Sequence, residues 1–169
     1  MTFTPQDTAR FMTESDTFDG PEILGDSVPY LAHRVGNLME RLFEPSLKSA
    51  DLTMDMWRVL FILDSVGEHN LVDLARVTTV KTSTLSRLIG RMERRGLISK
   101  TRSDRDNRAV DVTILDPGRE IVERLTPRVN EVRDLVSDGF GPDELRILKT
   151  YMRRLYRTLR AFERQADGR

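Results

Sequence analysis

The feature that most constrains this 169-residue chain is a regular apolar seam near its C-terminus. The spacing of these residues predicts a helix over residues 143–165 whose apolar stripe packs along another helix, as in a coiled coil. One small chain cannot cover such a stripe completely, so we expect it to be buried against a second copy. The seam residues, spaced 3-4-3-4-3, are Leu145, Leu148, Met152, Leu155, Leu159 and Phe162.

Five further helices are expected upstream of this seam, because apolar residues recur at helical spacing in each segment. Ser27 is positioned to cap the first helix. Pro45 is expected to mark the end of that helix, because proline interrupts the hydrogen-bond ladder. Gly67 predicts the end of the second. The expected helices span residues 27–45, 54–66, a short segment after Asn70, 82–95 and 116–136, the last bent at Pro127.

Two short segments are expected to form β-strands, which makes the fold class mainly α with a small β-hairpin. Residues 97–101 and 110–115 are the strands, and the polar residues 102–109 between them favour a hairpin. No stretch approaches the roughly 20 consecutive apolar residues of a membrane span. The N-terminal residues lack the basic start and apolar run of a secretory signal. We therefore expect a soluble, cytoplasmic protein.

Charge is segregated along the chain, although 27 basic and 27 acidic residues give a formal net charge of zero. Residues 76–108 hold ten basic and three acidic side chains, a net charge of +7. Residues 146–169 hold eight and two, a net charge of +6. Residues 1–55, with four basic and ten acidic, and 109–145, with four and nine, are acidic. Basic blocks indicate a surface for a polyanion, although we favour a solvated helix face for the C-terminal one.

The expected helix over residues 82–95 has a polar face suited to the major groove of DNA. Its regularly spaced apolar residues, from Leu85 to Met92, fix the buried side. The opposite side holds hydroxyls, arginines and one glycine without a carboxylate, and arginine can donate two hydrogen bonds to guanine. An ordinary surface helix would mix Glu with Lys, so we favour DNA contact. The predicted contacts are Lys81, Thr82, Ser83, Thr84, Ser86, Arg87, Gly90, Arg91 and Arg94.

The hairpin beyond this helix carries two arginines at or beside its tip, Arg105 and Arg108. An arginine on such a loop can enter the narrow minor groove or follow the phosphates. The neighbouring Asp104, Asp106 and Asn107 also have a structural explanation, since these residue types close turns through their own backbone. One basic hairpin is weak evidence alone, but directly after a helix-turn-helix it strongly indicates DNA binding.

These segments resemble the MarR family of winged helix-turn-helix transcription regulators over about residues 27–165. The resemblance is carried by DLARVTTVKTSTLSRLIGRMERRGLISK, the hairpin SDRDNRAVDVTILDPG and the closing GPDEL helix. It implies an obligate homodimer in which the first, fifth and sixth helices intertwine, with a recognition helix and a wing centred on Arg105. Thr78-Thr79 stands where a Leu-Gly pair is common, and Lys81 where a serine often caps the recognition helix.

The chain is expected to divide into four parts, of which the last three lie within the resemblance. A flexible arm at residues 1–26 precedes an N-terminal dimerisation helix at 27–52. A winged helix-turn-helix DNA-binding lobe follows at 53–116. The C-terminal dimerisation helices occupy residues 117–169, and the apolar seam lies in the last of them.

The resemblance also implies a small anionic, often aromatic, effector between the dimer helices and the DNA-binding lobe, whose binding releases DNA. An arginine pairs naturally with a carboxylate, and Tyr or Trp can stack on a ring. Alternatives stay open: Trp57 also suits core packing, His33 the helix surface, and Arg58 an ion pair with a nearby acid. The candidate effector residues are Tyr30, His33, Arg34, Trp57 and Arg58.

The expected function is that of a homodimeric repressor, bound to an inverted-repeat operator in double-stranded DNA and released by a small anionic, aromatic ligand. The alternative is a winged-helix module for protein or RNA contacts. An enzyme is not expected, because no phosphate loop, metal-ligand spacing or nucleophile–base pair is visible. With no cysteine and two histidines, we expect no cofactor, no metal site and no thiol sensor.

Overall fold

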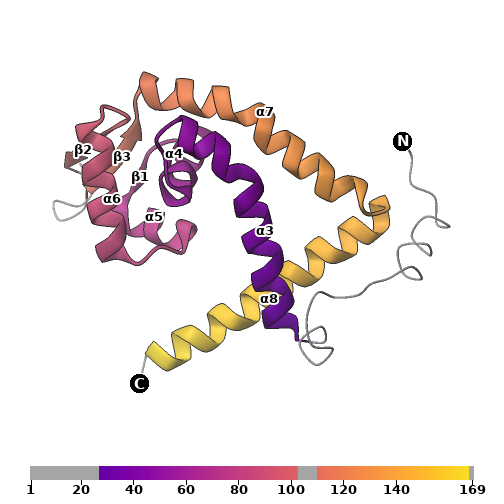
Figure 1. Cartoon of the computed structure of the whole chain (residues 1–169). Coiled ribbons are helices and arrows are strands. Elements are labelled where there is room, and N and C mark those ends of the chain that lie inside the picture. Colours follow the sequence, from indigo (N-terminus) through magenta and orange to yellow (C-terminus); the bar gives the residue numbers. More distant parts are fainter. Residues whose placement is uncertain (1–26, 103–109, 168–169) are drawn as a thin grey trace. The chain divides into compact units, whose positions relative to one another are not determined.

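The computed structural model describes residues 27–102 and 110–167, a mainly helical chain with one small antiparallel sheet, which confirms the expected fold class (Figure 1). Two compact units are present: His33–Glu131, and the described residues of 1–32 and 132–169. None of the helices in these described ranges is long and apolar enough to cross a membrane. The elements are α3 (Val28–Ser49), α4 (Met54–Val66), β1 (His69–Asn70), α5 (Leu71–Thr78), α6 (Thr82–Arg94), β2 (Ile98–Arg102), β3 (Val110–Ile114), α7 (Asp116–Asp138) and α8 (Pro142–Asp167).

Helix α3 continues past Pro45 to Ser49, so the expectation that Pro45 ends the helix is wrong. The reason lies in the packing of the turns around the proline. Phe43 and Leu47 are only 6% and 4% exposed, and Ala50 just beyond the helix is also buried, whereas the proline ring is exposed. Burial of these apolar side chains outweighs the backbone hydrogen bond that proline cannot donate.

The predicted ends of α4 and α5 are confirmed by their capping contacts. The hydroxyl of Thr53 accepts a hydrogen bond from the backbone N–H of Met56, at 3.3 Å, and so caps α4. Gly67 ends that helix with a φ of 82°, a backbone conformation that glycine adopts without strain. Asn70 accepts a hydrogen bond from the N–H of Asp73 at 2.8 Å and donates one to its carboxylate. These contacts satisfy backbone donors that the first helical turns leave free.

The sheet has the strand order β1-β3-β2, with both pairings antiparallel. Strands β2 and β3 form the predicted hairpin, in register from Ile98 opposite Ile114 to Arg102 opposite Val110. Strand β1 was not expected, because two residues are too short to show the alternating pattern of a strand. It pairs His69 with Val112 and ties the start of α5 to the hairpin.

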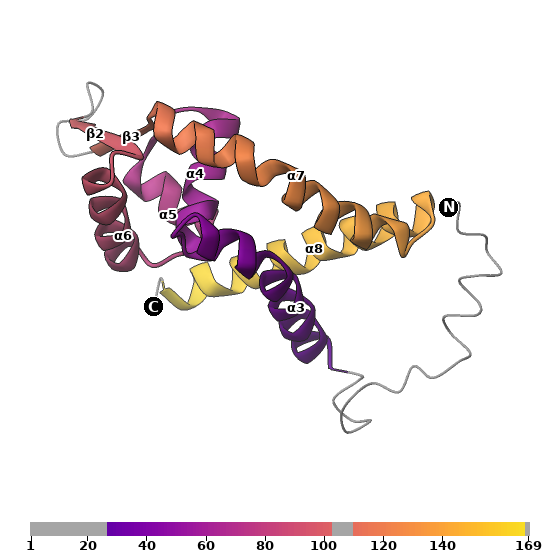
Figure 2. The same cartoon turned by 45° about the horizontal axis from the view of Figure 1, so that its top comes forward.

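The core of the larger unit lies between α4, α5, α6 and the sheet, which stay together in both views (Figures 1 and 2). This core fixes α6 to the unit by one side only and leaves its other side open. Helix α8, in contrast, contributes no buried side chain among those described: three seam residues, Leu145, Leu148 and Leu155, are half-buried, and the other three are exposed. Core residues with almost no exposure include Leu60, Leu63, Leu74, Leu85, Met92, Ile98 and Val112.

Candidate functional site

Helix α6 has one buried and one exposed face, as expected for a helix that reads DNA. Leu85, Ile89 and Met92 are at most 1% exposed and Leu88 is 8% exposed. The predicted contact residues on the other side are exposed, apart from Gly90, which is half-buried. The structure therefore brings together all the predicted DNA contacts except the two hairpin arginines.

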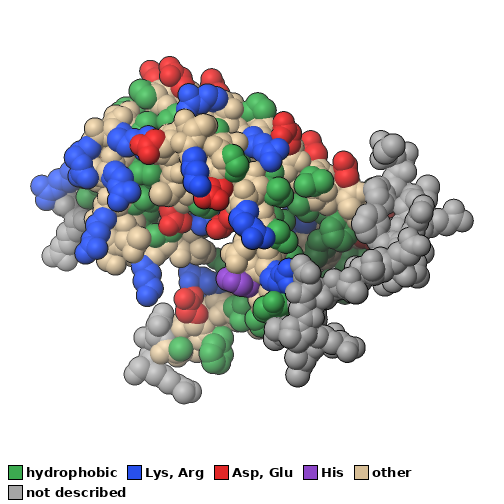
Figure 3. All heavy atoms as spheres, viewed as in Figure 1, with side chains coloured by type: hydrophobic (Ala, Val, Ile, Leu, Met, Phe, Trp, Pro, Cys, Tyr) green, Lys and Arg blue, Asp and Glu red, His purple; other side chains and the backbone are tan. Residues whose placement is uncertain are grey.

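The arginines of this exposed face are not neutralised by neighbouring acids. Arg87, Arg91 and Arg94 form no ion pair with any residue in the described ranges. The one carboxylate of the helix, on Glu93, forms an ion pair with the ammonium group of Lys100 at 2.7 Å. Lys and Arg side chains gather over α6 and the adjoining sheet in Figure 3. Unpaired arginines on a helix face are available to phosphates and base edges.

Arg95, the residue after α6, has a different role that sequence reasoning did not assign. Its guanidinium donates hydrogen bonds to the backbone carbonyls of Asp51, at 2.5 Å, and Ala50, at 3.2 Å. These carbonyls belong to the connection between α3 and α4. Arg95 therefore anchors the end of α6 and is not available to DNA. No periodic pattern in the sequence distinguishes it from the arginines beside it.

Gly90 lies in the middle of α6, where glycine costs about 0.5–1 kcal/mol relative to alanine. A Cβ at this position would meet only the Nη1 atom of Arg94, at 3.8 Å, which is an ordinary contact. The packing of the described chain therefore does not require a glycine here. A surface that another molecule must approach closely does require one.

The turn before α6 is unusual in its residue types. Thr79 has φ 59° and ψ 15°, the left-handed conformation in which a β-branched residue is strained. This is the position at which a glycine is common in the family that the sequence resembles.

Lys81 precedes α6 without giving it a side-chain cap. Thr78 is buried, and its hydroxyl donates a hydrogen bond to the carbonyl of Leu74 at 2.7 Å.

The hairpin arginines cannot be placed in the same way. Arg105 and Arg108 lie outside the described residues, between the end of β2 at Arg102 and the start of β3 at Val110. Their contact with DNA stays a prediction.

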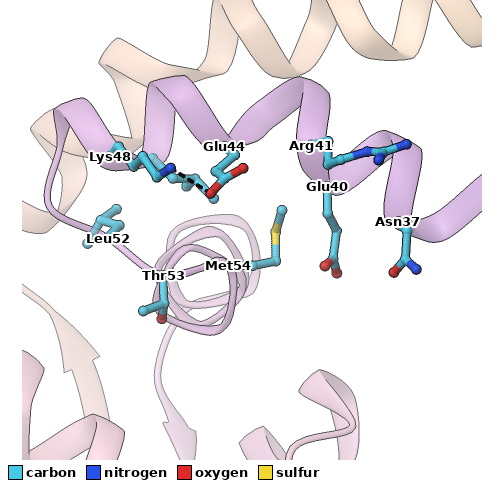
Figure 4. Close-up of a pocket in the computed structure, with 9 residues that line it drawn as sticks. Asn37, Glu40, Arg41, Glu44, Lys48, Leu52, Thr53 and Met54 are labelled. Atoms are coloured by element: carbon cyan, nitrogen blue, oxygen red, sulfur yellow. Dashed lines mark ion pairs between the residues drawn. The ribbon is translucent and has the colours of Figure 1, made fainter.

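A pocket of about 550 Å³ lies between α3 and the start of α4 (Figure 4). Asn37 and Glu40 point from α3 toward the side on which Met54 of α4 lies, whereas the Arg41 side chain extends along α3. Within the lining, Glu44 is paired with Lys48 at 2.8 Å, and Arg41 forms no ion pair with a described residue. Sequence reasoning did not single out this pocket. Its lining residues are Asn37, Glu40, Arg41, Glu44, Leu47, Lys48, Leu52, Thr53 and Met54.

Two of the five candidate effector residues, Trp57 and Arg58, lie on α4 and differ in environment. Trp57 is 6% exposed and packs edge-on against Phe43, with ring centroids 5.2 Å apart, so it belongs to the core. The Arg58 guanidinium contacts Glu40 of α3 at 2.5 Å and Asp55 at 3.0 Å. Since Glu40 also lines the pocket, Arg58 is linked to the pocket through its ion-pair partner.

The other three candidates, Tyr30, His33 and Arg34, all lie on α3. Tyr30 and Arg34 are half-buried and His33 is exposed. The Nδ2 atom of Asn37 lies 2.9 Å from the Nε2 atom of His33, and Asn37 lines the pocket. The described residues contain no group of three His, Asp or Glu side chains that could hold a metal ion.

Two helices carry rows of exposed apolar residues that a soluble chain would be expected to cover. On α8, Met152, Leu159 and Phe162 of the predicted seam are 52%, 59% and 73% exposed. Glu163, beside the seam, accepts a hydrogen bond from Arg160, and this bond and its negative charge raise the pKa of that guanidinium. On α3 the exposed apolar residues are Val28, Leu31, Val35, Leu38, Met39 and Leu42.

Comparison with known proteins finds similarity to helix-turn-helix regulators. It is 26% identical over 113 residues to the HTH-type transcriptional regulator FarR of Neisseria gonorrhoeae, covering 67% of this chain and 77% of FarR. It is 34% identical over 94 residues to the HTH-type transcriptional repressor IacR of Pseudomonas putida, covering 56% of this chain and 54% of IacR. The chain thus spans about half the length of IacR.

Solved structures show the same fold. The chain resembles BpsR of Bordetella bronchiseptica with a TM-score of 0.71 and 26% identity, over 81% of this chain and 98% of BpsR. It resembles NadR, solved with 4-hydroxyphenylacetate, with a TM-score of 0.70 and 23% identity, over 76% and 92% of the two chains. Residues 52–110, which span α4, α5, α6 and β2, match the family model described as "MarR family". Residues 52–110 of this chain therefore match the MarR family, and the chain shares the fold of these solved structures.

Proposed function

We propose that this chain is a homodimeric, sequence-specific DNA-binding transcription regulator that acts as a repressor. The observation that carries the proposal is the exposed face of α6, where three arginines that pair with no acid in the described part of the chain surround a glycine that packing does not require. Such a face suits the major groove, where arginines read guanine and a glycine permits close approach. The naming of IacR as a repressor favours repression over activation.

The homodimer is supported by the uncovered apolar faces of α3 and α8. Leucine and phenylalanine side chains that remain half or more exposed in one chain gain about 1–2 kcal/mol each when a partner buries them, a share of the roughly 1.5–3 kcal/mol of complete burial. A dimer with two-fold symmetry presents two copies of α6 to the same duplex. The operator is then an inverted repeat with half-sites about 10 base pairs apart.

DNA binding is tested by selecting bound sequences from a random double-stranded pool and titrating the winner at several salt concentrations. Arg87→Ala is expected to cost about 1–3 kcal/mol per half-site and to relax preference at one operator position. Arg105→Ala is expected to weaken binding to all sequences and to lower the salt slope by about one per hairpin. Arg124→Ala, at an exposed arginine of α7, is the control and should change neither. Selection that enriches no inverted repeat would favour the alternative, a winged-helix module for protein or RNA contacts.

The proposed effector is a small aromatic acid. The DNA binding of BpsR is regulated by 6-hydroxynicotinic acid, and NadR has been solved with 4-hydroxyphenylacetate. Both ligands combine a carboxyl group with a ring. The pocket between α3 and α4 has a volume in the range of small-molecule sites, about 300–1,000 Å³. A ligand carboxylate would replace Glu40 as the partner of Arg58 or pair with Arg41, which has no acid partner among the described residues.

Effector binding is tested by a thermal-shift screen of aromatic acids, followed by operator titrations with each compound that gives a saturable shift. Release of DNA requires that the ligand bind the free conformation better by several kcal/mol. Arg58→Ala and Arg41→Ala are expected to reduce the thermal shift while leaving affinity for the operator nearly unchanged, and Arg34→Ala tests the remaining arginine of α3. If all three variants respond like the parent, the ligand binds elsewhere.

A further inference from the structure

The polar side of α8 carries a continuous stripe of basic residues. At 100° per residue these cations fall on one side of the helix, roughly opposite the apolar seam. All of them are exposed except Arg160, which is half-buried. The basic stripe consists of Arg146, Lys149, Arg153, Arg157, Arg160 and Arg164, at intervals of 3, 4, 4, 3 and 4 residues.

Helix α7 carries an acidic stripe with the same intervals. It lies opposite the buried face formed by Gly118, Val122 and Leu125, and all its members are exposed. Acidic side chains follow the outer edge of α7 in Figure 3. The acidic stripe consists of Glu120, Glu123, Glu131, Asp134 and Asp138, with Pro127 in the one position that has no charge.

Within the described residues of one chain, few charges of the two stripes take part in ion pairs. The ion pairs that do involve them are local, such as Arg146 with Asp143 and Glu131 with Arg128, each three residues apart. Four cations, including Lys149, and three acids, including Glu120, form no ion pair with another residue in the described ranges. Most of the charge of each stripe is therefore available to a second molecule.

We propose that the basic stripe of α8 in one copy docks on the acidic stripe of α7 in another copy, and so joins dimers into larger assemblies. Both stripes extend over 19 residues (Glu120 to Asp138, Arg146 to Arg164), and the 18 rises between their ends span about 27 Å of helix at about 1.5 Å per residue. With the two helices parallel and their equal intervals in register, five of the six cations face an acid, and Arg153 faces the uncharged Pro127. Each stripe repels another of its own sign, so the contact must pair α7 with α8.

The dimer of the proposed function is compatible with this contact. The acidic stripe lies opposite the core-facing side of α7, and the basic stripe lies roughly opposite the seam of α8, so burial of the apolar faces of α3 and α8 leaves both stripes exposed. The net charge of the chain is zero, so no long-range repulsion keeps the dimers apart. Contacts made only of exposed ion pairs are weak and screened by salt, so the assembly is expected to form at low ionic strength.

The first test is the mass of the full chain without DNA, measured by light scattering at two salt concentrations. At about 0.01 M salt the screening length is about 30 Å, and at about 1 M it is about 3 Å. The expected result is a dimer at high salt and at least twice that mass at low salt. A monomer at high salt would contradict the proposed homodimer but not the docking of the stripes. A dimer at both salt concentrations would overturn the docking of the stripes.

The second test exchanges charges between the stripes. Glu120→Lys with Glu123→Lys, and Arg146→Glu with Lys149→Glu, should each remain dimeric at low salt, because these two pairs of residues face one another when the stripes are in register. Mixing the two variants should restore the larger mass, because the reversed α7 now matches the reversed α8.

The control variant, Arg87→Glu with Arg91→Glu, changes the net charge as much as the α8 variant does but alters α6 instead. It should keep the larger mass by itself and should not restore it to the α7 variant. If it behaves like the α8 variant, the association follows net charge and the proposal is wrong. Unchanged circular dichroism melting curves show that loss of mass is not loss of folding.

Discussion

Gly118, near the start of α7, lies directly against the backbone carbonyl of Leu97, and a side-chain carbon at this glycine would overlap that oxygen. The same carbon would lie only 2.8 Å from Cγ1 of Ile114 and 3.2 Å from Cδ2 of Leu60. Two of these neighbours, Leu97 and Ile114, are next to or part of the strands of the hairpin. The first turn of α7 is thus in backbone contact with the base of that hairpin.

Gly118→Ala is expected to destabilise the protein, because a methyl group has no space between α7 and the hairpin. Overpacking of this kind costs about 1–3 kcal/mol. Gly36→Ala on α3 is the matched control, since nothing lies within 4 Å of its missing Cβ, and alanine should stabilise that helix by about 0.5–1 kcal/mol. Urea denaturation measures both free energies of unfolding. Changes of the same sign in the two variants would contradict the close contact at Gly118.

Gly90→Ala is expected to change folding stability and DNA affinity in opposite directions. Alanine in the interior of α6 should stabilise the fold by about 0.5–1 kcal/mol, because the added carbon meets only Arg94 at 3.8 Å. In the DNA complex the same methyl group would crowd the groove, with an expected loss of about 1–3 kcal/mol. Thermal melting and operator titration separate the two effects. Unchanged operator affinity would show that Gly90 does not face DNA.

Thr79→Gly is expected to stabilise the turn before α6. The left-handed conformation at φ 59° costs a non-glycine residue about 1–2 kcal/mol, whereas glycine adds about 0.4–1 kcal/mol of unfolded-chain entropy. The expected gain is therefore about 1 kcal/mol or less, read from the urea midpoint. Gly67→Ala is the reciprocal variant, because its φ is 82° and no atom crowds it, so strain alone should lower its stability. A destabilised Thr79→Gly variant would mean that the threonine hydroxyl contributes more than its backbone costs.

Leu159→Asp is expected to dissociate the dimer without unfolding the chain. Leu159 is 59% exposed in a single chain, so its replacement removes little packing there. Across a two-fold interface the burial of two such leucines is lost, about 2–3.5 kcal/mol, and two carboxylates are added, which weakens dimerisation by on the order of 100-fold. Ala161→Asp adds the same charge two residues away, outside the seam, and should leave the dimer intact. Sedimentation velocity at several concentrations distinguishes the two, and equal dimer fractions would exclude the seam as the interface.

Local rules predicted the elements of this fold well, because their signals lie within a few residues of one another. The helices that follow Thr53 and Asn70 begin where they are expected, with these two residues as caps, and the buried side of α6 follows directly from its apolar spacing. Pro45 shows where such rules fail. Its effect on α3 depends on the burial of Phe43 and Leu47, which is decided by residues distant in the sequence.

The candidate site was predictable to the extent that it lies on one helix. The α6 face was found because all its residues share one periodicity, whereas the pocket combines α3 with the start of α4 and has no common spacing. The sequence indicates Arg58 as an effector residue by its charge, but its ion pair with Glu40 depends on the packing of α4 against α3. Side chains that meet only after folding leave no pattern in a single sequence.

The anchoring of Arg95 has a mechanical consequence for how α6 can move. Its hydrogen bonds to the carbonyls of Ala50 and Asp51 couple the C-terminal end of α6 to the segment that directly follows α3. A tilt of the C-terminal half of α3 is then transmitted to α6 as a rigid-body movement, without repacking of the core between them. A ligand that acts on α3 at Asn37 or Glu40 would therefore change where the arginine-bearing helix points while leaving its own shape untouched.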